Sequence, residues 1–187
     1  MSEFAATSTG ISGLLVLQAQ SVIEPRGEVR ELYRRSRYSG RVPGISRSWD
    51  QINLTATKRG AVRGLHGEDM QKLVTVASGS AFGVYVDVRE ASPTRGAVET
   101  VDLTPGVQVL VPRGVRNGFQ ATGPGVTEYL YFFDREWAPG MAGVAVNPLD
   151  RELVIAWPIP IDPADESQIS AKDASAPSLS TALAPQA

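Results

Sequence analysis

Short apolar segments separated by turn residues run through most of this sequence and constrain its fold more than any other feature. Between Phe82 and Arg89, apolar side chains at every second position indicate a strand with one buried face. Further strands are expected over 14–17, 98–103, 107–111 and 126–133, with turns at 24–27, 91–94, 104–106, 112–114 and 123–125. Because no amphipathic helix of three turns interrupts the series, the chain is predicted to be an all-β sandwich or barrel, with helical turns only in segments such as 28–37.

Composition divides the 187 residues into one domain and two flexible ends. Residues 1–10 are small and polar and predict a flexible N-terminus. Residues 162–187 are rich in Ala, Ser, Asp and Pro and predict a disordered tail, which leaves 11–161 as the folded domain. The segment Tyr129–Phe133 is apolar on both faces, so its outer face needs a cover. A second copy of the chain is the simplest cover, and a homodimer is expected.

Charge and residue usage exclude several classes of function. The net charge of -2 and the absence of cysteine argue against a nucleic-acid or membrane-surface binder, a disulfide scaffold and a thiol enzyme. A single histidine cannot supply a transition-metal site, so no metal and no cofactor are expected. The sequence has no run long and apolar enough to cross a membrane, and its start does not resemble a signal peptide, so a cytoplasmic location is predicted.

The one histidine is the first candidate for acid–base chemistry. His66 closes the run Arg63-Gly64-Leu65-His66. Imidazole is the side chain whose unperturbed pKa lies near neutral pH. If the protein is an enzyme that moves protons, His66 is therefore the expected base.

Eight motifs occur in an order that resembles a known family, over about residues 24–158. They are Arg26-Gly27 with Glu31; Gln51 with Asn53; Arg63-Gly64-Leu65-His66; Gln71-Lys72-Leu73-Val74; Val86-Asp87-Val88-Arg89 with Ser92-Pro93-Thr94; Pro112-Arg113-Gly114 with Gly118-Phe119; Tyr129-Leu130-Tyr131; and Pro148-Leu149-Asp150 with Trp157-Pro158. In these motifs the chain resembles the dTDP-4-dehydrorhamnose 3,5-epimerases, small enzymes with a cupin (jelly-roll) fold. The resemblance implies a β-sandwich isomerase that acts on dTDP-linked 4-keto-6-deoxy sugars in deoxysugar biosynthesis.

The resemblance also implies catalytic roles for four residues. His66 would remove a proton from the carbon beside the ketone, and Tyr131 would return one from the opposite face. Asp150, which precedes the Trp-Pro pair, would orient the imidazole. Lys72 would stabilise the enolate oxygen, with Asp87 nearby as its partner.

Substrate-binding roles follow from the same resemblance. Arginine suits phosphate oxygens because its planar group donates in pairs. The residues that match nucleotide and diphosphate positions are Arg26, Glu31, Gln51, Asn53 and Arg63. Trp137 is expected to stack on the thymine or to pack at a dimer edge.

The sequence departs from the family pattern at three places. Asn117 stands where the family has a second histidine, Gly67-Glu68 replaces the usual glutamine after the His66 motif, and Phe132 replaces the lysine often found after Tyr131. Asparagine donates hydrogen bonds but cannot relay a proton, so Asn117 is a candidate for binding the enolate oxygen. These departures leave open whether C3 alone or both C3 and C5 are epimerised. A 3,4-ketoisomerase of the same sugars and a non-catalytic nucleotide-sugar-binding cupin remain alternatives.

Overall fold

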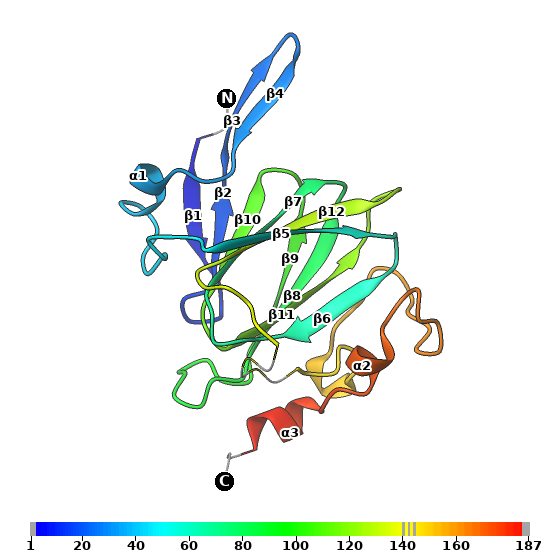
Figure 1. The fold of residues 1–187 in the computed structure, drawn as a ribbon. Coiled ribbons are helices and arrows are strands. Elements are labelled where there is room, and N and C mark those ends of the chain that lie inside the picture. The colour runs from blue at the N-terminus through cyan, green and yellow to red at the C-terminus, as the bar shows by residue number, and fades with distance from the viewer. Residues whose placement is uncertain (1–2, 140, 142, 144, 185–187) are drawn as a thin grey trace.

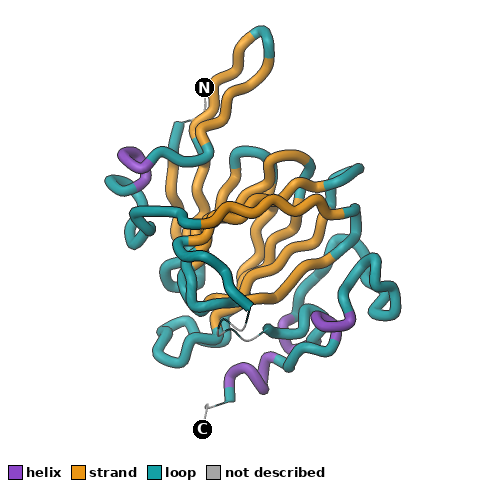
Figure 2. Tube along the Cα trace, in the orientation of Figure 1, coloured by secondary structure: helices purple, strands orange, loops and turns teal. Residues whose placement is uncertain are grey.

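The computed structural model describes residues 3–139, 141, 143 and 145–184. Almost all regular structure in this part of the chain is β-strand, as Figures 1 and 2 show. The helical segments within it are the short α1 (Arg35–Tyr38), η1 (Arg151–Leu153), α2 (Ala171–Ala174) and α3 (Leu179–Leu183). The predicted all-β, cupin-like fold is confirmed.

Two antiparallel sheets and one hairpin make up the architecture. The larger sheet has the order β1-β2-β10-β7-β12-β5 and the smaller sheet has the order β6-β11-β8-β9. The larger sheet contains β1 (Ala5–Ser8), β2 (Leu15–Gln18), β10 (Val107–Val111), β7 (Lys72–Ser78), β12 (Thr127–Phe133) and β5 (Gln51–Thr57). The smaller sheet contains β6 (Val62–His66), β11 (Val115–Ala121), β8 (Ala81–Asp87) and β9 (Val98–Leu103), and the hairpin contains β3 (Gln20–Glu24) and β4 (Gly27–Glu31). Figure 1 shows this hairpin projecting away from the body of the molecule.

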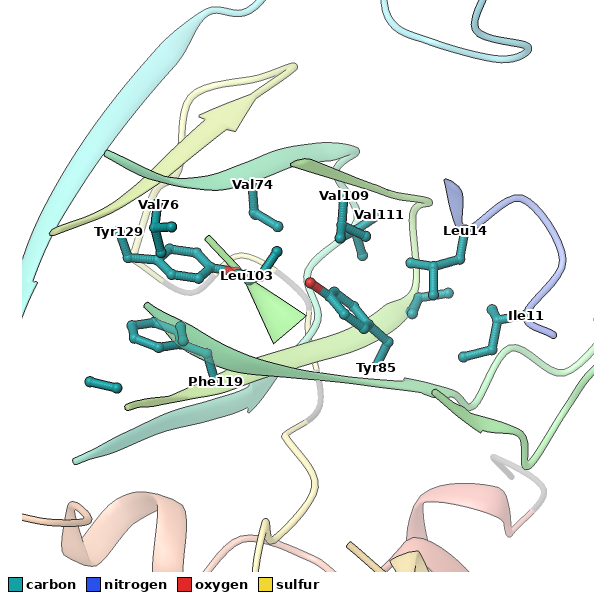
Figure 3. Packing of buried hydrophobic residues seen from close by; sticks show 13 residues of the cluster. Ile11, Leu14, Val74, Val76, Tyr85, Leu103, Val109, Val111, Phe119 and Tyr129 are labelled. Atoms are coloured by element: carbon teal, nitrogen blue, oxygen red, sulfur yellow. The ribbon is translucent and has the colours of Figure 1, made fainter. Parts of the chain in front are cut away.

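The main core lies between the two sheets. Alternate residues of each strand point inward, so Val74, Val109 and Tyr129 of the larger sheet meet Tyr85 and Phe119 of the smaller sheet. In Figure 3 the rings of Tyr85 and Tyr129 extend into this space from opposite sheets. The rings of Phe119 and Tyr129 are stacked with centroids 3.9 Å apart. This interior is closed and apolar over most of its length.

The outer faces of both sheets are also covered, by segments of the same chain. Phe132 on the outside of β12 packs with Tyr38, Val42 and Leu73, in a cluster that residues 33–49 complete. The outer face of β8, with Val84 and Val86, packs under the C-terminal segment. The apolar outer face of β12 therefore has a cover within the chain, which weakens the sequence argument for a second copy there.

Both terminal predictions need correction within the described residues. The C-terminal segment is ordered over 162–184, because Ser170 and Ser178 cap α2 and α3 and Leu179 packs into the cluster under β8. The main chain of Gln168 also accepts a hydrogen bond from the amide of Val62, which adds this segment to the edge of β6. The N-terminal segment contains β1, which pairs with β2 through its backbone. The composition of the two terminal segments predicted flexibility and disorder because they are rich in small and polar residues. Helix capping and strand pairing also use such residues. Residues 1–2 and 185–187 lie outside the described part.

The segment 28–37 is only partly helical. It begins with strand β4 and ends inside α1, which spans Arg35–Tyr38. The strands expected over 98–103 and 107–111 coincide with β9 and β10. The strands expected over 14–17 and 126–133 differ from β2 and β12 by one residue at their ends. The strand expected over 82–89 differs from β8 by one residue at its start and two at its end.

Candidate active site

A cavity of about 620 Å³ opens at one end of the space between the sheets. Its walls are inward-facing side chains of β5, β7 and β12 from the larger sheet, β6 and β11 from the smaller sheet, and the C-terminal segment. Its charged and polar lining includes Asn53, Lys58, Arg63, His66, Glu68, Lys72, Asn117, Tyr131, Trp137, Lys172 and Asp173. Most residues that the sequence singled out for chemistry therefore meet in one place.

A bulge brings Arg63 and His66 to the same cavity. Residues three apart on a regular strand face opposite sides of a sheet. Here the register between β6 and β11 shifts, so that His66 lies opposite Asn117 and Arg63 lies opposite Phe119. At the bulge β6 and β11 approach each other closely. Gly64 permits this approach, because a Cβ atom there would lie 2.6 Å from the Cα of Gly118. The Gly64 φ of +118° is also one that other residues rarely adopt.

The carboxylate that pairs with His66 is Asp173. Its Oδ1 lies 2.6 Å from Nε2 of the imidazole, and the Asp173 side chain is almost fully buried. Burial raises the pKa of this carboxyl, but the contact with His66 and the amide of Gly64 outweigh burial, so the pKa of Asp173 is lowered. A neutral imidazole that donates its Nε2 proton to this carboxylate leaves Nδ1 as the basic atom. The pair has the form of a base with its orienting carboxylate.

The expectation that Asp150 orients His66 is wrong. The carboxylate of Asp150 accepts hydrogen bonds from the amides of Glu152 and Leu179, and so caps η1 and ties α3 to it. Its place in the sequence next to the Trp-Pro motif suggested the role, but its two oxygens are used by the backbone. Asp150 does not line the cavity.

Tyr131 enters the cavity from the opposite sheet. It lies on β12 directly across from Asn53 of β5 and Val74 of β7, with its side chain facing inward. Burial raises the pKa of its phenol above the usual value, although the guanidinium of Arg63 opposes this effect. The phenol is therefore protonated at neutral pH and able to donate a proton or a hydrogen bond. The acid role that the resemblance implies stays a prediction.

Lys72 lies in the cavity with partners that the sequence analysis did not assign to it. Its Nζ is 2.5 Å from Oε2 of Glu68 and 2.9 Å from Oδ1 of Asn117. The expected pairing with Asp87 is wrong, because Asp87 is fully buried elsewhere, where it accepts hydrogen bonds from Arg89, Ser92 and Thr94. Asp87 thus holds the loop after β8 and does not line the cavity, so its expected substrate contact is also wrong.

Four of the expected binding residues line the cavity, and a fifth supports two of them. The four are Asn53, Arg63, Asn117 and Trp137. Gln51 lies just outside, where its Oε1 accepts from the amide of Trp137 at 2.7 Å and its Nε2 donates to Oδ1 of Asn53 at 3.0 Å. Gln51 therefore positions lining residues. Direct substrate contacts by these five residues stay predictions.

Arg26 and Glu31 lie apart from the cavity of their own chain. Arg26 is in the turn of the projecting hairpin, with its side chain 88% exposed, and pairs with Glu24. Glu31 closes β4 and forms ion pairs with Arg34 and Arg37. Neither residue lines the cavity, so their expected contacts with the nucleotide stay predictions.

Several lining residues escaped the sequence analysis. Asp173 and Lys172 lie in the segment taken for a tail, although the spacing Ser170-x-x-Asp173 is a helix-start signal that marks it as folded. Glu68 was noted only as a departure from the family pattern. Among the described residues no group of His, Cys, Asp and Glu could hold a metal ion, and no helix is long and apolar enough to cross a membrane.

Comparison with known proteins places the chain in a family. A family model described as dTDP-4-dehydrorhamnose 3,5-epimerase matches residues 8–181. A dTDP-4-dehydrorhamnose 3,5-epimerase of Streptomyces griseus is 34% identical over 178 residues, which cover 90% of this chain and 84% of the relative.

Solved structures of epimerases are similar in fold to this chain. The crystal structure of an epimerase from Legionella pneumophila in complex with dTDP-4-keto-L-rhamnose superposes with a TM-score of 0.86, 28% identity and coverage of 99% of both chains. A 3'-monoepimerase from Streptomyces bikiniensis in complex with dTDP-quinovose gives a TM-score of 0.81 and 30% identity over 92% of this chain and 86% of that one. The resemblance and the class of enzyme read from the sequence, an isomerase, are confirmed. This chain belongs to the dTDP-4-dehydrorhamnose 3,5-epimerase family.

Proposed function

We propose that this protein epimerises a dTDP-linked 4-keto-6-deoxyhexose at C3, or at both C3 and C5, without a cofactor. The observation that carries this proposal is the approach of His66 and Tyr131 to one cavity from opposite sheets. Inversion at a carbon requires a base on one face and a proton donor on the other. An imidazole with a buried carboxylate partner and a protonated phenol meet that requirement.

The chemistry begins with the hydrogen on the carbon beside the 4-keto group. His66 takes this proton, and the ionised Asp173 stabilises the imidazolium that forms. The electrons move onto the ketone oxygen as an enolate. Lys72 and Asn117, which contact each other in the cavity wall, would donate to that oxygen, a contribution of about 3–4 kcal/mol per donor where such groups have been removed. Tyr131 then protonates the carbon from the other face and regains a proton from solvent, while His66 releases its proton to solvent.

Cations at the exposed part of the cavity suit the diphosphate. Arg63, Lys58 and Lys172 all line it, and all three are exposed. Arg63 is held by a hydrogen bond of 3.0 Å from its Nε to Oγ1 of Thr57, which leaves the terminal nitrogens free to bind phosphate oxygens. Trp137, half exposed at the wall, offers a ring for the thymine.

A homodimer would account for the projecting hairpin and for several exposed apolar residues. Ile23 and Val29 on the hairpin and Ile52 and Leu54 on the edge strand β5 are large apolar side chains that are exposed. A second copy packed against the hairpin would give Arg26 a cavity to reach, and with it the nucleotide contact that the resemblance implies. Sedimentation analysis of the intact protein tests this directly, and a monomer at micromolar concentration would contradict it. A cytoplasmic location stays a prediction from the sequence.

The test of function is incubation with dTDP-4-keto-6-deoxyglucose in D₂O, with deuterium read at C3 and C5 by NMR. Label at both carbons shows proton exchange at C3 and C5, label at C3 alone shows exchange at C3 only, and the configuration of the labelled sugar shows whether inversion accompanies the exchange. His66→Ala should lose the label while retaining affinity for dTDP, because the base is removed and the nucleotide contacts remain. A wild-type protein that binds dTDP but introduces no label would contradict the proposal and favour a binding protein.

A further inference from the structure

The ion pair between Glu68 and Lys72 lies in the wall of the cavity. The Lys72 side chain is only 5% exposed, and its Nζ contacts Oε2 of Glu68 and Oδ1 of Asn117. A lysine has only donors, so the oxygen of the Asn117 amide must face it, and the amide nitrogen is left to donate elsewhere. The carboxylate of Glu68 thus fixes the position of the Lys72 ammonium, and the ammonium fixes the orientation of the Asn117 amide.

Apart from Glu68, the surroundings of Lys72 disfavour the charged form of its ammonium group. Burial lowers the pKa of Lys72, the guanidinium of Arg116 on β11 lowers it further, and the Glu68 carboxylate raises it. The other neighbouring strands place uncharged residues beside Lys72. The ring centroid of Phe133 on β12 lies 5.9 Å from Nζ, and Val111 of β10 is the sheet partner of Lys72. His66 on β6 faces Glu68. Burial raises the pKa of Glu68, but Lys72 more than offsets this, so its pKa is lowered and it is ionised at neutral pH.

The backbone holds Glu68 at this position. Nη1 of Arg116 donates to the carbonyl of Gly67 at 2.9 Å, and the carbonyl of Glu68 accepts from the amide of Met70 at 2.7 Å. A Cβ at position 67 would lie 2.5 Å from Nη1 of Arg116 and 3.0 Å from the carbonyl oxygen of Val115. The glycine is therefore needed for Arg116 to reach the chain and fix the residue that follows.

We propose that Glu68 is a positioning residue that keeps Lys72 protonated and directs its ammonium toward Asn117 and the enolate oxygen. The proposal rests on the proposed function for the role of Lys72, whereas the ion pair itself does not depend on it. It also connects two of the departures from the family pattern, those at positions 68 and 117. A carboxylate at position 68 and a neutral amide at position 117 together surround one buried ammonium, in place of the glutamine and histidine of the family.

Direct titration of Lys72 separates the ion pair from catalysis. The lysines of this chain are Lys58, Lys72 and Lys172, so protein labelled with ¹³C,¹⁵N-lysine gives three side-chain signals, and Lys72→Arg identifies the signal of Lys72. In Glu68→Gln the pKa of Lys72 should fall by about 1–3 pH units, because an opposite charge within contact distance is lost. Glu68→Asp keeps the charge and should restore most of this difference. An unchanged Lys72 pKa in Glu68→Gln would overturn the proposal.

The kinetic measurement shows whether that charge serves the reaction. Lys72 must be protonated to act as a charged donor, so the alkaline limb of the kcat/KM profile should move to lower pH in Glu68→Gln by the amount seen in the titration. Asp69→Asn is the matched control, since it removes the adjacent exposed carboxylate, which pairs with Arg113 and Arg135 outside the cavity. Its profile should match the wild type. If the pKa of Lys72 falls in Glu68→Gln while the alkaline limb of the kcat/KM profile stays in place, the charge that Glu68 maintains on Lys72 does not serve the reaction, and that part of the proposal is overturned. A wild type without deuterium exchange would instead refute the proposed function.

Discussion

Nε2 of His66 and Oδ1 of Asp173 lie 2.6 Å apart although 107 residues separate them in the sequence. The histidine ends β6, and the aspartate lies in α2, which the C-terminal segment places against that strand. A base from the sandwich and its carboxylate from the last part of the chain thus form one unit. The folding of residues 162–184 is therefore part of building the site.

Asp173→Asn should reduce activity strongly and Asp150→Asn should not. The amide keeps the shape of Asp173 but removes the charge that stabilises the imidazolium, so kcat is expected to fall by about 10²–10⁴-fold, in line with aspartate removal from other such pairs. Asp150→Asn should leave kcat near the wild-type value and lower stability by about 0.5–2 kcal/mol through weaker capping. Steady-state kinetics and urea unfolding of both variants check this. Equal loss of kcat in the two would contradict the reassignment.

Gly64→Ala should disrupt the site through the backbone. The added methyl would lie 2.6 Å from the Cα of Gly118 and 2.8 Å from the carbonyl of Asn117, neither of which can move without breaking the pairing of β6 with β11. A loss of stability of about 1–3 kcal/mol is expected from the positive φ alone, together with a loss of activity. Gly125→Ala is the control, because nothing lies within 4 Å of its added Cβ. Urea unfolding that shows both variants to be equally stable would contradict the close approach.

Asp87→Asn should affect stability and its dependence on pH. Three side chains donate to this buried carboxylate, and although burial raises its pKa, these hydrogen bonds lower the pKa well below the usual value. A depressed carboxyl pKa stabilises the fold above about pH 4, the unfolded value, and this contribution is lost as the pH falls toward the folded value. The variant should be less stable by about 3–5 kcal/mol at pH 7, since Arg89 loses its partner.

The check on Asp87 is denaturant unfolding of both proteins from pH 7 down to pH 2. The difference in unfolding free energy between wild type and Asp87→Asn should narrow as the pH falls below about 4. A difference that stays constant over this range would show that the charge of Asp87 contributes nothing.

The strands that the sequence predicted are those that alternation and turn residues define locally. β9 and β10 lie between Pro and Gly turns, so their bounds follow from the sequence. β7 carries no such signal, since Leu73, Val74 and Thr75 are all buried with no polar face between them. One face of β7 packs toward the smaller sheet through Val74 and the other packs under residues 33–49 through Leu73, so its burial on both faces is visible only in the fold.

The site was predictable to the extent that motifs carry it. His66, Lys72, Tyr131, Asn117 and Arg63 were expected together and do line one cavity. The partners of His66 and Lys72 were predicted wrongly. Asp150 and Asp87 were assigned as partners because of the motifs in which they lie, whereas hydrogen bonds form between residues that the fold brings together. The spacing Ser170-x-x-Asp173 was a signal in the sequence that could have marked the segment of Asp173 as folded.

The central claim is that the base and the acid act from opposite sheets, and Tyr131→Phe tests it most directly. The variant keeps the ring and removes only the proton donor, so His66 should still exchange the substrate hydrogen with solvent. In D₂O with dTDP-4-keto-6-deoxyglucose, deuterium should continue to enter the recovered substrate while formation of the inverted product falls by about 10²-fold or more. Equal loss of exchange and inversion would contradict the division of roles between the two sheets.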